Sequence, residues 1–411
     1  MNQTIRNLLL LFPSGGIKWL LRDEFSDTRA AGAVNGTPAT PGPGTRVVTD
    51  TDSKLTVSGG NLTFAPHSTP AWGDPGLWHG AVTRTAGRVW VAKLKLAGAN
   101  AHLTLGLDDN QAGAVNRPAF YFGTTGDILT YDTGGYFLTG SYQATTDYRI
   151  AIVLRSAGGY CLIKGGVFTT WTLLSIRSSG NTATLYPGVG NYSHTGTIDF
   201  VRIPDALWFP TPLAYDTYTR PNGAIGVSET AGPDGQAVTA RTYTDQVGTW
   251  SVAGNTAVAT VLGIVTLPAL HADVVMQCTL TTPGAGVTPA GIVVRWLDAN
   301  NYWYVRVTPG TAGNDFELVE INAGVPTVRG AADKDPAAAT AYTITVITYG
   351  QTIDVYWNNV REINYTTAAL NETQGIHGLR DEGNSNFIFD NLTVFPRGTG
   401  GEYAALDKWS S

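Results

Sequence analysis

The chain has 411 residues, a formal net charge of −6 and only 14% charged residues. This length exceeds one ordinary hydrophobic core and predicts two domains of near-average size. No run of Lys or Arg offers a footprint for a phosphate backbone, which argues against nucleic acid as a partner. Gly is abundant, aromatics reach 10%, and long stretches of Ala, Leu, Glu and Lys are missing. This composition is typical of short strands joined by turns, so helix should be scarce.

An apolar run at residues 8–12 follows Arg6 near the start of the sequence. The run is short for a signal-peptide core, and no small-x-small cleavage pattern follows it. No stretch approaches the roughly 20 apolar residues that span a bilayer. We therefore expect neither membrane insertion nor export by the general route. Residues 1–20 are either a short edge strand or frayed end, or an apolar arm that docks on a partner protein.

Strand patterning is clearest in the second half of the chain. Two β-rich runs, 291–297 and 301–307, flank the turn cluster Asp298-Ala299-Asn300 and predict a hairpin. Further runs follow at 316–321 and 352–357. Because strands recur every ten or so residues without helices between them, the sheets should be antiparallel and a sandwich or jelly roll is favoured. Cys161 and Cys278 lie in strand-like runs of different halves and are expected to be buried free thiols.

The two halves of the sequence match each other at a constant offset of about 190 to 195 residues. The matched pairs of segments are 23–27 with 216–220, 53–61 with 248–255, 148–153 with 342–347, and 198–204 with 389–396. Unrelated segments would not keep one offset along the chain, so the sequence predicts an internal duplication. The predicted organisation is an arm (1–20), a first domain (21–207), a linker (208–214), a second domain (215–397) and a tail (398–411).

The order of motifs in the second half resembles the concanavalin A-like lectin/glucanase superfamily, in its laminin-G-like branch. The motifs are the opening Asp216-Thr217-Tyr218, the strand 248–252, the hairpin 298–303, His377-Gly378-Leu379-Arg380, and the closing strand 389–394. The first half keeps the opening and closing elements but departs in the middle. The expected fold class is therefore all-β, with two tandem antiparallel β-sandwich domains of the concanavalin A-like jelly-roll type.

The resemblance implies binding of glycans or proteins and, in some branches, polysaccharide cleavage. Such modules occur in bacteriophage tail and fibre proteins and in bacterial surface proteins. We expect a non-catalytic virion protein, located in the virion or outside the cell, that binds a cell-surface glycan or receptor. The alternatives are a purely structural virion protein, whose jelly rolls serve as spacers and which binds only other virion proteins through residues 5–20, and a secreted bacterial adhesin. A homo-oligomer or membership of a larger assembly is expected in each case.

Catalysis of the glucanase type is not expected. It needs two carboxyl groups, which the superfamily's glucanases place as Glu-x-Asp-x-Glu or Glu-x-Asp-x-x-Glu on one strand. Neither pattern occurs in the sequence, and no Gly-x-Ser-x-Gly or His-Glu-x-x-His motif organises the histidines. We therefore expect no enzyme activity.

Calcium is the one cofactor that the sequence suggests. Carboxylates with loop carbonyls suit a hard cation. The opening and closing aspartates of each half should lie on neighbouring strands if the domain ends meet as they do in the resembled fold. Turn capping is the competing interpretation. The candidate calcium ligands are Asp23, Asp199, Asp216 and Asp390.

Two aromatic clusters are candidate sugar-binding sites, because sandwiches bind sugars with exposed rings. The first lies in a Gly/Pro-framed loop of the first half that the second half lacks. The second lies on predicted strands of the second half. The competing interpretation is that these rings fill the core or the domain interface. The candidates are Trp72, Trp78, His79, Tyr302, Trp303, Tyr356 and Trp357.

Overall fold

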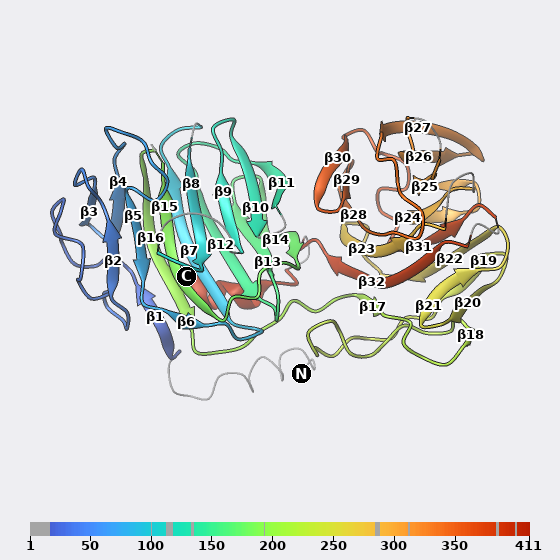
Figure 1. The fold of residues 1–411 in the computed structure, drawn as a ribbon, viewed down its shortest axis with the longest axis horizontal. Helices are drawn as coiled ribbons and strands as arrows, with labels where there is room; N and C mark the ends of the chain where they lie inside the picture. Colours follow the sequence, from blue (N-terminus) through green and yellow to red (C-terminus); the bar gives the residue numbers. More distant parts are fainter. Residues whose placement is uncertain are drawn as a thin grey trace. The chain divides into compact units, whose positions relative to one another are not determined.

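The computed structural model describes residues 17–99, 101–111, 118–132, 135–192, 194–283, 288–310, 313–383, 386–398 and 401–411. The chain forms two compact units (Figure 1). The first unit runs to Phe209 and also includes Gly398–Ser411, and the second unit is Pro210–Arg397. Most of the predicted N-terminal arm lies outside the described residues. Its last residues enter a strand, Trp19–Asp23.

The first unit is a sandwich of two antiparallel sheets, called sheet 1 and sheet 2 here. Sheet 1 has the order β14 (Phe168–Arg177), β13 (Gly159–Gly165), β12 (Asp147–Leu154), β7 (Val89–Leu96), β16 (Gly196–Pro204), β4 (Asn61–Phe64) and β3 (Leu55–Ser58), with β1 (Trp19–Asp23) paired to β16. Sheet 2 has the order β11 (Gly135–Ser141), β10 (Asp127–Asp132), β9 (Ala119–Phe122), β8 (Leu103–Asp108), β15 (Thr184–Asn191), β5 (Gly76–His79) and β2 (Arg46–Thr49), with β6 (Val82–Thr83) paired to β15.

The second unit is also a sandwich, made of sheet 3 and sheet 4. Sheet 3 has the order β18 (Gly223–Ala224), β20 (Trp250–Ala253), β21 (Thr256–Ala259), β32 (Ile388–Pro396), β23 (Val274–Thr281), β28 (Ala341–Tyr349), β29 (Thr352–Trp357) and β30 (Val360–Tyr365), with β17 (Ala214–Asp216) paired to β32. Sheet 4 has the order β19 (Thr244–Val247), β22 (Gly263–Pro268), β31 (Ile376–Asp381), β24 (Ala290–Asp298), β25 (Asn301–Val307), β26 (Phe316–Asn322) and β27 (Val325–Ala332).

The strand order is the same in the two units. Read along sheets 2 and 4, β11-β10-β9-β8-β15-β5-β2 corresponds to β27-β26-β25-β24-β31-β22-β19. Sheets 1 and 3 correspond in the same way from β14 to β3 and from β30 to β20, and the opening strand of each unit pairs with its closing strand. This shared order supports the predicted duplication, although a common origin of the two halves stays a prediction.

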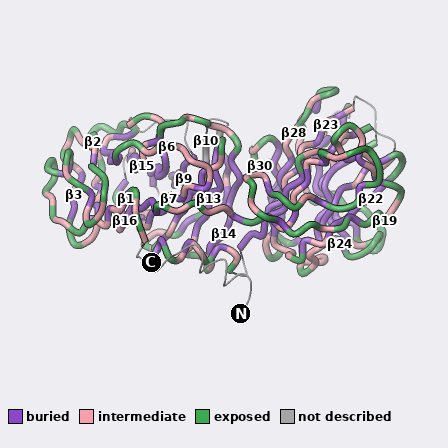
Figure 2. The backbone as a smooth tube through the Cα atoms, turned by 90° about the horizontal axis from the view of Figure 1, so that it is seen from below, coloured by how far each residue is buried: buried purple, intermediate pink, exposed green. Residues whose placement is uncertain are grey.

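Alternating side chains from both sheets of each unit form its core, as a sandwich requires. In the first unit, Trp90 and Ile150 of sheet 1 share a buried cluster with Phe120 of sheet 2. In the second unit, Met276 of sheet 3 shares one with Val305 of sheet 4. Figure 2 shows buried stretches of the chain in purple along the strands of both units. The all-β prediction is thus confirmed.

Helix is as scarce as the composition predicts. Among the described residues it is limited to a 3₁₀ turn, η1 (Ala404–Leu406), and one short helix, α2 (Asp407–Ser410). No described helix has the length and apolarity needed to cross a membrane. Both cysteines are buried free thiols, as expected.

The C-terminal segment packs on the first unit instead of forming a separate tail (Figure 1). Trp409 is buried, and its ring lies 6.3 Å from that of Trp208. Lys164 forms an ion pair with Asp407 at 2.7 Å, and Arg202 donates a hydrogen bond to the Ser411 carbonyl at 2.7 Å. An apolar anchor flanked by charged contacts holds the segment, so residues 398–411 complete the first unit.

Candidate functional site

The loop aromatics of the first unit do not form one exposed platform. Trp72 is 42% exposed, but Trp78 and His79 are buried. Both buried residues belong to β5, in the interior of sheet 2. The expectation that these three residues present an open face together is therefore wrong for Trp78 and His79.

The burial of Trp78 has a local cause. Trp78 lies opposite Gly188 in the neighbouring strand β15, and a Cβ on that glycine would come within 2.4 Å of the Trp78 ring. A Cβ on Gly76 would come within 2.1 Å of the same ring. The two glycines leave space for the indole to lie flat on the sheet, and its N–H donates to Asp108 at 3.2 Å. The ring is a packing element and has no free face for a sugar.

The second predicted aromatic cluster is also buried. Trp303 lies in the core, and its indole N–H donates to the Leu370 carbonyl at 2.9 Å. Trp357 packs in the core against Phe316, and Tyr356 on the other face of β29 is also buried. These three rings expose no stacking face, so they fill space as the competing interpretation held. Tyr302 is also buried, but it lies on the opposite face of β25 from Trp303, where its ring packs 4.8 Å from that of Trp296.

The aspartates proposed as calcium ligands are held by other groups, beginning with Asp23. Its two carboxylate oxygens accept hydrogen bonds from Arg46 at 2.7 Å each, and His79 lies 3.0 Å away. Burial alone would raise the pKa of Asp23, but the hydrogen bonds and charges of Arg46 and His79 outweigh burial and lower it. A guanidinium therefore stands where the calcium hypothesis placed a cation.

The other three candidate ligands are partnered as well. Asp216 forms a bidentate pair with Arg220, at 2.6 and 3.1 Å. Asp199 forms an ion pair with Lys93. Asp390 accepts the backbone N–H of Asn391 at 2.7 Å, as a turn-capping aspartate does. The opening and closing strands do lie side by side, but their aspartates are used within the fold.

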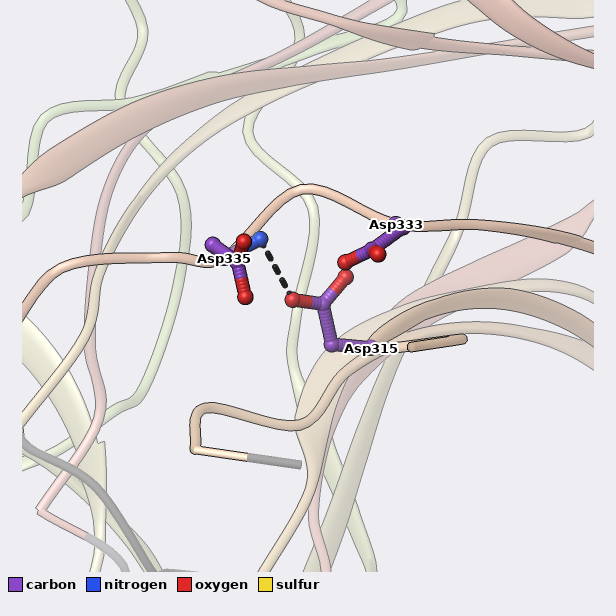
Figure 3. Close-up of side chains that lie close together, drawn as sticks. All are labelled: Asp315, Asp333 and Asp335. Atoms are coloured by element: carbon purple, nitrogen blue, oxygen red, sulfur yellow. Dashed lines mark hydrogen bonds between the residues drawn. The ribbon is translucent and has the colours of Figure 1, made fainter. Parts of the chain in front are cut away.

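One acidic cluster appears that the sequence analysis did not single out. Carboxylate oxygens of Asp315, Asp333 and Asp335 lie within 4.8 Å of one another (Figure 3). Asp315 is buried and accepts the backbone N–H groups of Lys334 and Asp335 at 2.7 and 2.6 Å. These bonds explain Asp315 as the anchor of the loop after β27, while Asp333 and Asp335 are exposed.

A pocket of about 250 Å³ lies on the outer face of sheet 4, the face away from the core of the second unit. Strand alternation creates it: Trp303, Val305 and Val307 of β25 point into the core. Tyr302, Tyr304 and Arg306 therefore point outward. The complete lining is Ala299, Asn300, Tyr302, Tyr304, Arg306, Val319, Ile321, Gly324, Pro326, Arg380 and Glu382.

Arg380 of β31 is the central polar group of the pocket. Its guanidinium lies over the rings of Tyr304 and Tyr302, 4.9 and 5.6 Å from their centroids. It donates a hydrogen bond to the Tyr302 hydroxyl and forms an ion pair with Glu382 at 3.4 Å. The rings, the hydroxyl and the carboxylate together fix the direction of the arginine.

Two buried polar atoms of this pocket lack a hydrogen-bond partner. The Tyr304 hydroxyl and Arg380 Nε make no hydrogen bond to any residue that the structure describes. Burial raises the pKa of Tyr304 well above its usual value, so the hydroxyl keeps its proton and can donate. Unsatisfied buried groups of this kind are rare in folded proteins and call for an explanation. The pocket can satisfy a ligand that brings hydroxyl or other oxygen groups.

Of the residues that line this pocket, Tyr302 was the one candidate site residue predicted from the sequence. The alternation of β25 was visible in the sequence and could have identified Tyr304 and Arg306 as the opposite face of the same strand. Arg380 was visible only as part of a motif. Its proximity to Tyr302, 78 residues earlier, depends on the pairing of β31 with β24.

No family model matches the chain, and no curated protein matches it. Among solved structures, the chain is similar to the carbohydrate-binding module CBM66 from Bacillus subtilis, with 18% identity over 37% of this chain and 94% of that one, at a TM-score of 0.32. It is also similar to the Caenorhabditis elegans galectin LEC-6, with 10% identity over 32% and 89% of the two chains and a TM-score of 0.27. A beta-1,3-glucanase from Mycobacterium marinum shows 12% identity over 46% and 100%, with a TM-score of 0.30. Similarity at this level assigns no function to the chain.

Proposed function

We propose that the second unit is a non-catalytic carbohydrate-binding module that holds one sugar residue of a glycan in the pocket on sheet 4. The observation that carries this proposal is the buried Tyr304 hydroxyl without a partner, beside Arg380 and Glu382. A ligand with several hydroxyl groups would supply the missing hydrogen-bond partner.

The chemistry of the lining suits a sugar. Arg380 and Arg306 are donors, Glu382 is an acceptor, and a tyrosine hydroxyl can be either. Neighbouring hydroxyl groups of a sugar donate and accept at the same time, so they can bridge such a mixed set. The volume of about 250 Å³ is below the roughly 300–1,000 Å³ of sites for drug-sized ligands. One ring fits this volume better than a long oligomer.

Binding without cleavage is the simpler interpretation of the charged groups. Glycoside hydrolysis needs two carboxyl groups on either side of the scissile bond. Glu382 is the one carboxylate among the residues that line the pocket. It forms an ion pair with Arg380, which suits an acceptor of fixed position better than an acid that must exchange a proton.

The assembly that would carry this module remains a prediction from the resemblance. A virion component, such as a bacteriophage tail, fibre or decoration protein, would use the site to attach to a cell-surface glycan. A secreted bacterial adhesin would use it in the same way. A purely structural protein would leave the pocket without a ligand, and this alternative predicts no glycan binding.

Tyr304→Phe tests the proposed site. The variant removes the unpartnered hydroxyl, so it should weaken glycan binding about tenfold or more while the melting temperature stays the same or rises. A substitution that damaged the fold would lower both the glycan affinity and the melting temperature. The measurement is a glycan-array screen of the full chain, followed by titration calorimetry with the sugars that bind and by thermal unfolding.

Tyr349→Phe is a matched control in the same unit. The Tyr349 hydroxyl donates to Asp354 at 3.2 Å on the other sheet, so its loss should lower stability and leave glycan affinity unchanged. Unchanged affinity in Tyr304→Phe would show that the pocket is not the site. An array on which the intact chain binds no glycan would overturn the proposed function.

A further inference from the structure

Four aromatic rings gather in the first unit, and none of them belongs to the pocket of the second unit. Trp72 lies 5.2 Å from Tyr192, 5.7 Å from Tyr121 and 5.8 Å from His102, measured between ring centroids. His102 in turn lies 5.1 Å from Tyr192. The rings come from four separate segments of the chain, so the fold and not the local sequence assembles them. We call this group the aromatic platform.

The aromatic platform lies on the outer face of sheet 2. Leu103 and Leu105 of β8 point into the core, as do Phe120 and Phe122 of β9. By strand alternation, Tyr121 must point outward. Tyr121 is paired with Thr104, which is paired with Gly190 of β15. Trp72, His102 and Tyr192 contact Tyr121 or one another at the end of these strands.

The same place in the second unit holds the proposed sugar pocket. There Arg306 of β25 is paired with Gly291 of β24, which is paired with Arg380 of β31. Strands β9, β8 and β15 correspond to β25, β24 and β31 in the shared strand order. The aromatic platform and the pocket are thus built on equivalent strands of two similar sandwiches, from different side chains.

The turn that carries Trp72 is fixed before any ligand arrives. The Asp74 N–H donates to the Ala71 carbonyl at 3.2 Å and closes the turn. The Asp74 carboxylate accepts the backbone N–H and the hydroxyl of Thr51, at 3.0 and 2.7 Å. The N–H of Asn191, at the end of β15, donates to the Pro75 carbonyl at 3.0 Å. An exposed Trp held in this way loses little conformational entropy when it binds.

Two polar groups of the aromatic platform, on Trp72 and Tyr192, have no partner among the described residues. Trp72 is 42% exposed, and neither its indole N–H nor the Tyr192 hydroxyl makes a hydrogen bond with a described residue. The Tyr121 hydroxyl and His102 Nδ1 lie 3.2 Å apart. Burial lowers the pKa of His102, so its ring is uncharged at neutral pH. The four rings therefore offer apolar faces and neutral hydrogen-bonding groups without a formal charge.

We propose that the aromatic platform is a second glycan-binding site, which stacks on the apolar face of an uncharged pyranose residue. The site is independent of the pocket in the second unit and differs in mode. Because Trp72 is 42% exposed, the aromatic platform suits a residue inside a glycan chain better than one enclosed sugar. One polypeptide would then carry two recognition sites of different selectivity, whose combined binding exceeds that of either site.

Titration of the full chain with neutral hexaoses tests the proposal: cellohexaose, mannohexaose, laminarihexaose and xylohexaose, each followed by calorimetry and by tryptophan fluorescence. With a hexaose that binds, Trp72→Ala should abolish the shift in tryptophan emission and lower the affinity of one site at least about tenfold. Trp72→Phe should retain part of that affinity because a ring remains. Trp19→Ala is the matched control, a half-buried Trp on sheet 1 whose loss should leave binding unchanged.

Comparison with Tyr304→Phe separates the two sites. Loss of binding in Tyr304→Phe but not in Trp72→Ala would overturn the aromatic platform and leave the pocket standing. Loss in Trp72→Ala alone would support the aromatic platform and remove the pocket. If no hexaose binds, or if Trp72→Ala instead disrupts a dimer detected by light scattering, the aromatic platform is a protein contact and the proposal fails.

Discussion

The two units share their strand order but place different side chains at equivalent positions. The opening aspartate of the first unit, Asp23, is buried with Arg46 and His79. Its equivalent, Asp216, pairs with Arg220, which is 24% exposed in its side chain. On the outer faces, Tyr121 of the first unit stands where the second unit has Arg306, and Gly190 stands where it has Arg380. Backbone order thus decides where a site can form, and the side chains at those places decide its chemistry.

The electrostatics of the opening aspartates differ in sign. Burial raises the pKa of both carboxyl groups. At Asp23 the bonds and charges of Arg46 and His79 more than cancel this effect, so the pKa falls below its usual value. At Asp216 the bonds from Arg220 and the Tyr218 N–H reduce the effect without cancelling it, so the pKa is raised. The charged form of Asp23 therefore stabilises the fold and that of Asp216 costs some stability.

The largest expected difference between the units follows from these two aspartates. Asp23→Ala leaves Arg46 buried with only Asp27 as a counter-charge, so it should lower the stability of the first unit by about 3 kcal/mol. Asp216→Ala should cost the second unit only about 1 kcal/mol, because Arg220 can turn to water. Hydrogen exchange measured by mass spectrometry reports each unit separately. Equal losses in both units would contradict the contrast.

One buried histidine of each unit extends the contrast, because the two rings have different hydrogen-bond partners. Both ring nitrogens of His79 face oxygen acceptors, Asp23 at 3.0 Å and the Pro187 carbonyl at 3.3 Å. In His377, Nε2 faces the His271 carbonyl at 2.8 Å, whereas Nδ1 accepts the N–H of Arg295 at 3.3 Å. One ring nitrogen of His377 thus donates and the other accepts, so its surroundings suit a neutral ring.

We expect the second unit to lose stability as the pH falls from 6.5 to 4. Burial lowers the pKa of His377 to about 4, so the unfolded chain takes up a proton more readily throughout that range. Above pH 6.5 His377 is neutral in both the folded and the unfolded chain, and this pH dependence is absent. As the pH falls through 4, the free energy of unfolding of the second unit drops by up to about 3 kcal/mol. Urea unfolding at a series of pH values measures the change.

His377→Gln serves as the control for this pH dependence. The amide can imitate one donor and one acceptor but does not titrate, so the pH dependence of the second unit should flatten between 6.5 and 4. The same slope in the variant would assign the effect to carboxyl groups elsewhere and would remove this difference between the units.

The sequence predicted the fold better than the site for a physical reason. The hairpin at 291–307 follows from two local runs and one turn cluster, and the structure has it as β24 and β25. The partners of Asp23 and the neighbours of Tyr302 come from strands far apart in the sequence, brought together by pairing register. Trp78 illustrates the same limit, because its burial depends on Gly188, 110 residues later. Local patterns carry strand identity, whereas a site depends on register.

The smallest expected effect on stability comes from the side chains that lie opposite two equivalent glycines, Gly188 and Gly378. In the first unit, Trp78 of β5 lies opposite Gly188, whereas in the second unit Thr266 of β22 lies opposite Gly378. Gly188→Ala should therefore cost the first unit about 1–3 kcal/mol, because the new methyl group would come within 2.4 Å of the indole.

Gly80→Ala is the matched control for this packing argument, one residue beyond β5. A Cβ on Gly80 meets no atom within 4 Å, so this variant should be neutral or slightly stabilising. Thermal unfolding of the two glycine variants beside the unchanged chain measures both effects. A neutral Gly188→Ala would mean that Trp78 can move off the sheet. In that case the Trp78 ring could itself reach the surface of sheet 2, and its packing over Gly188 would not distinguish the two units.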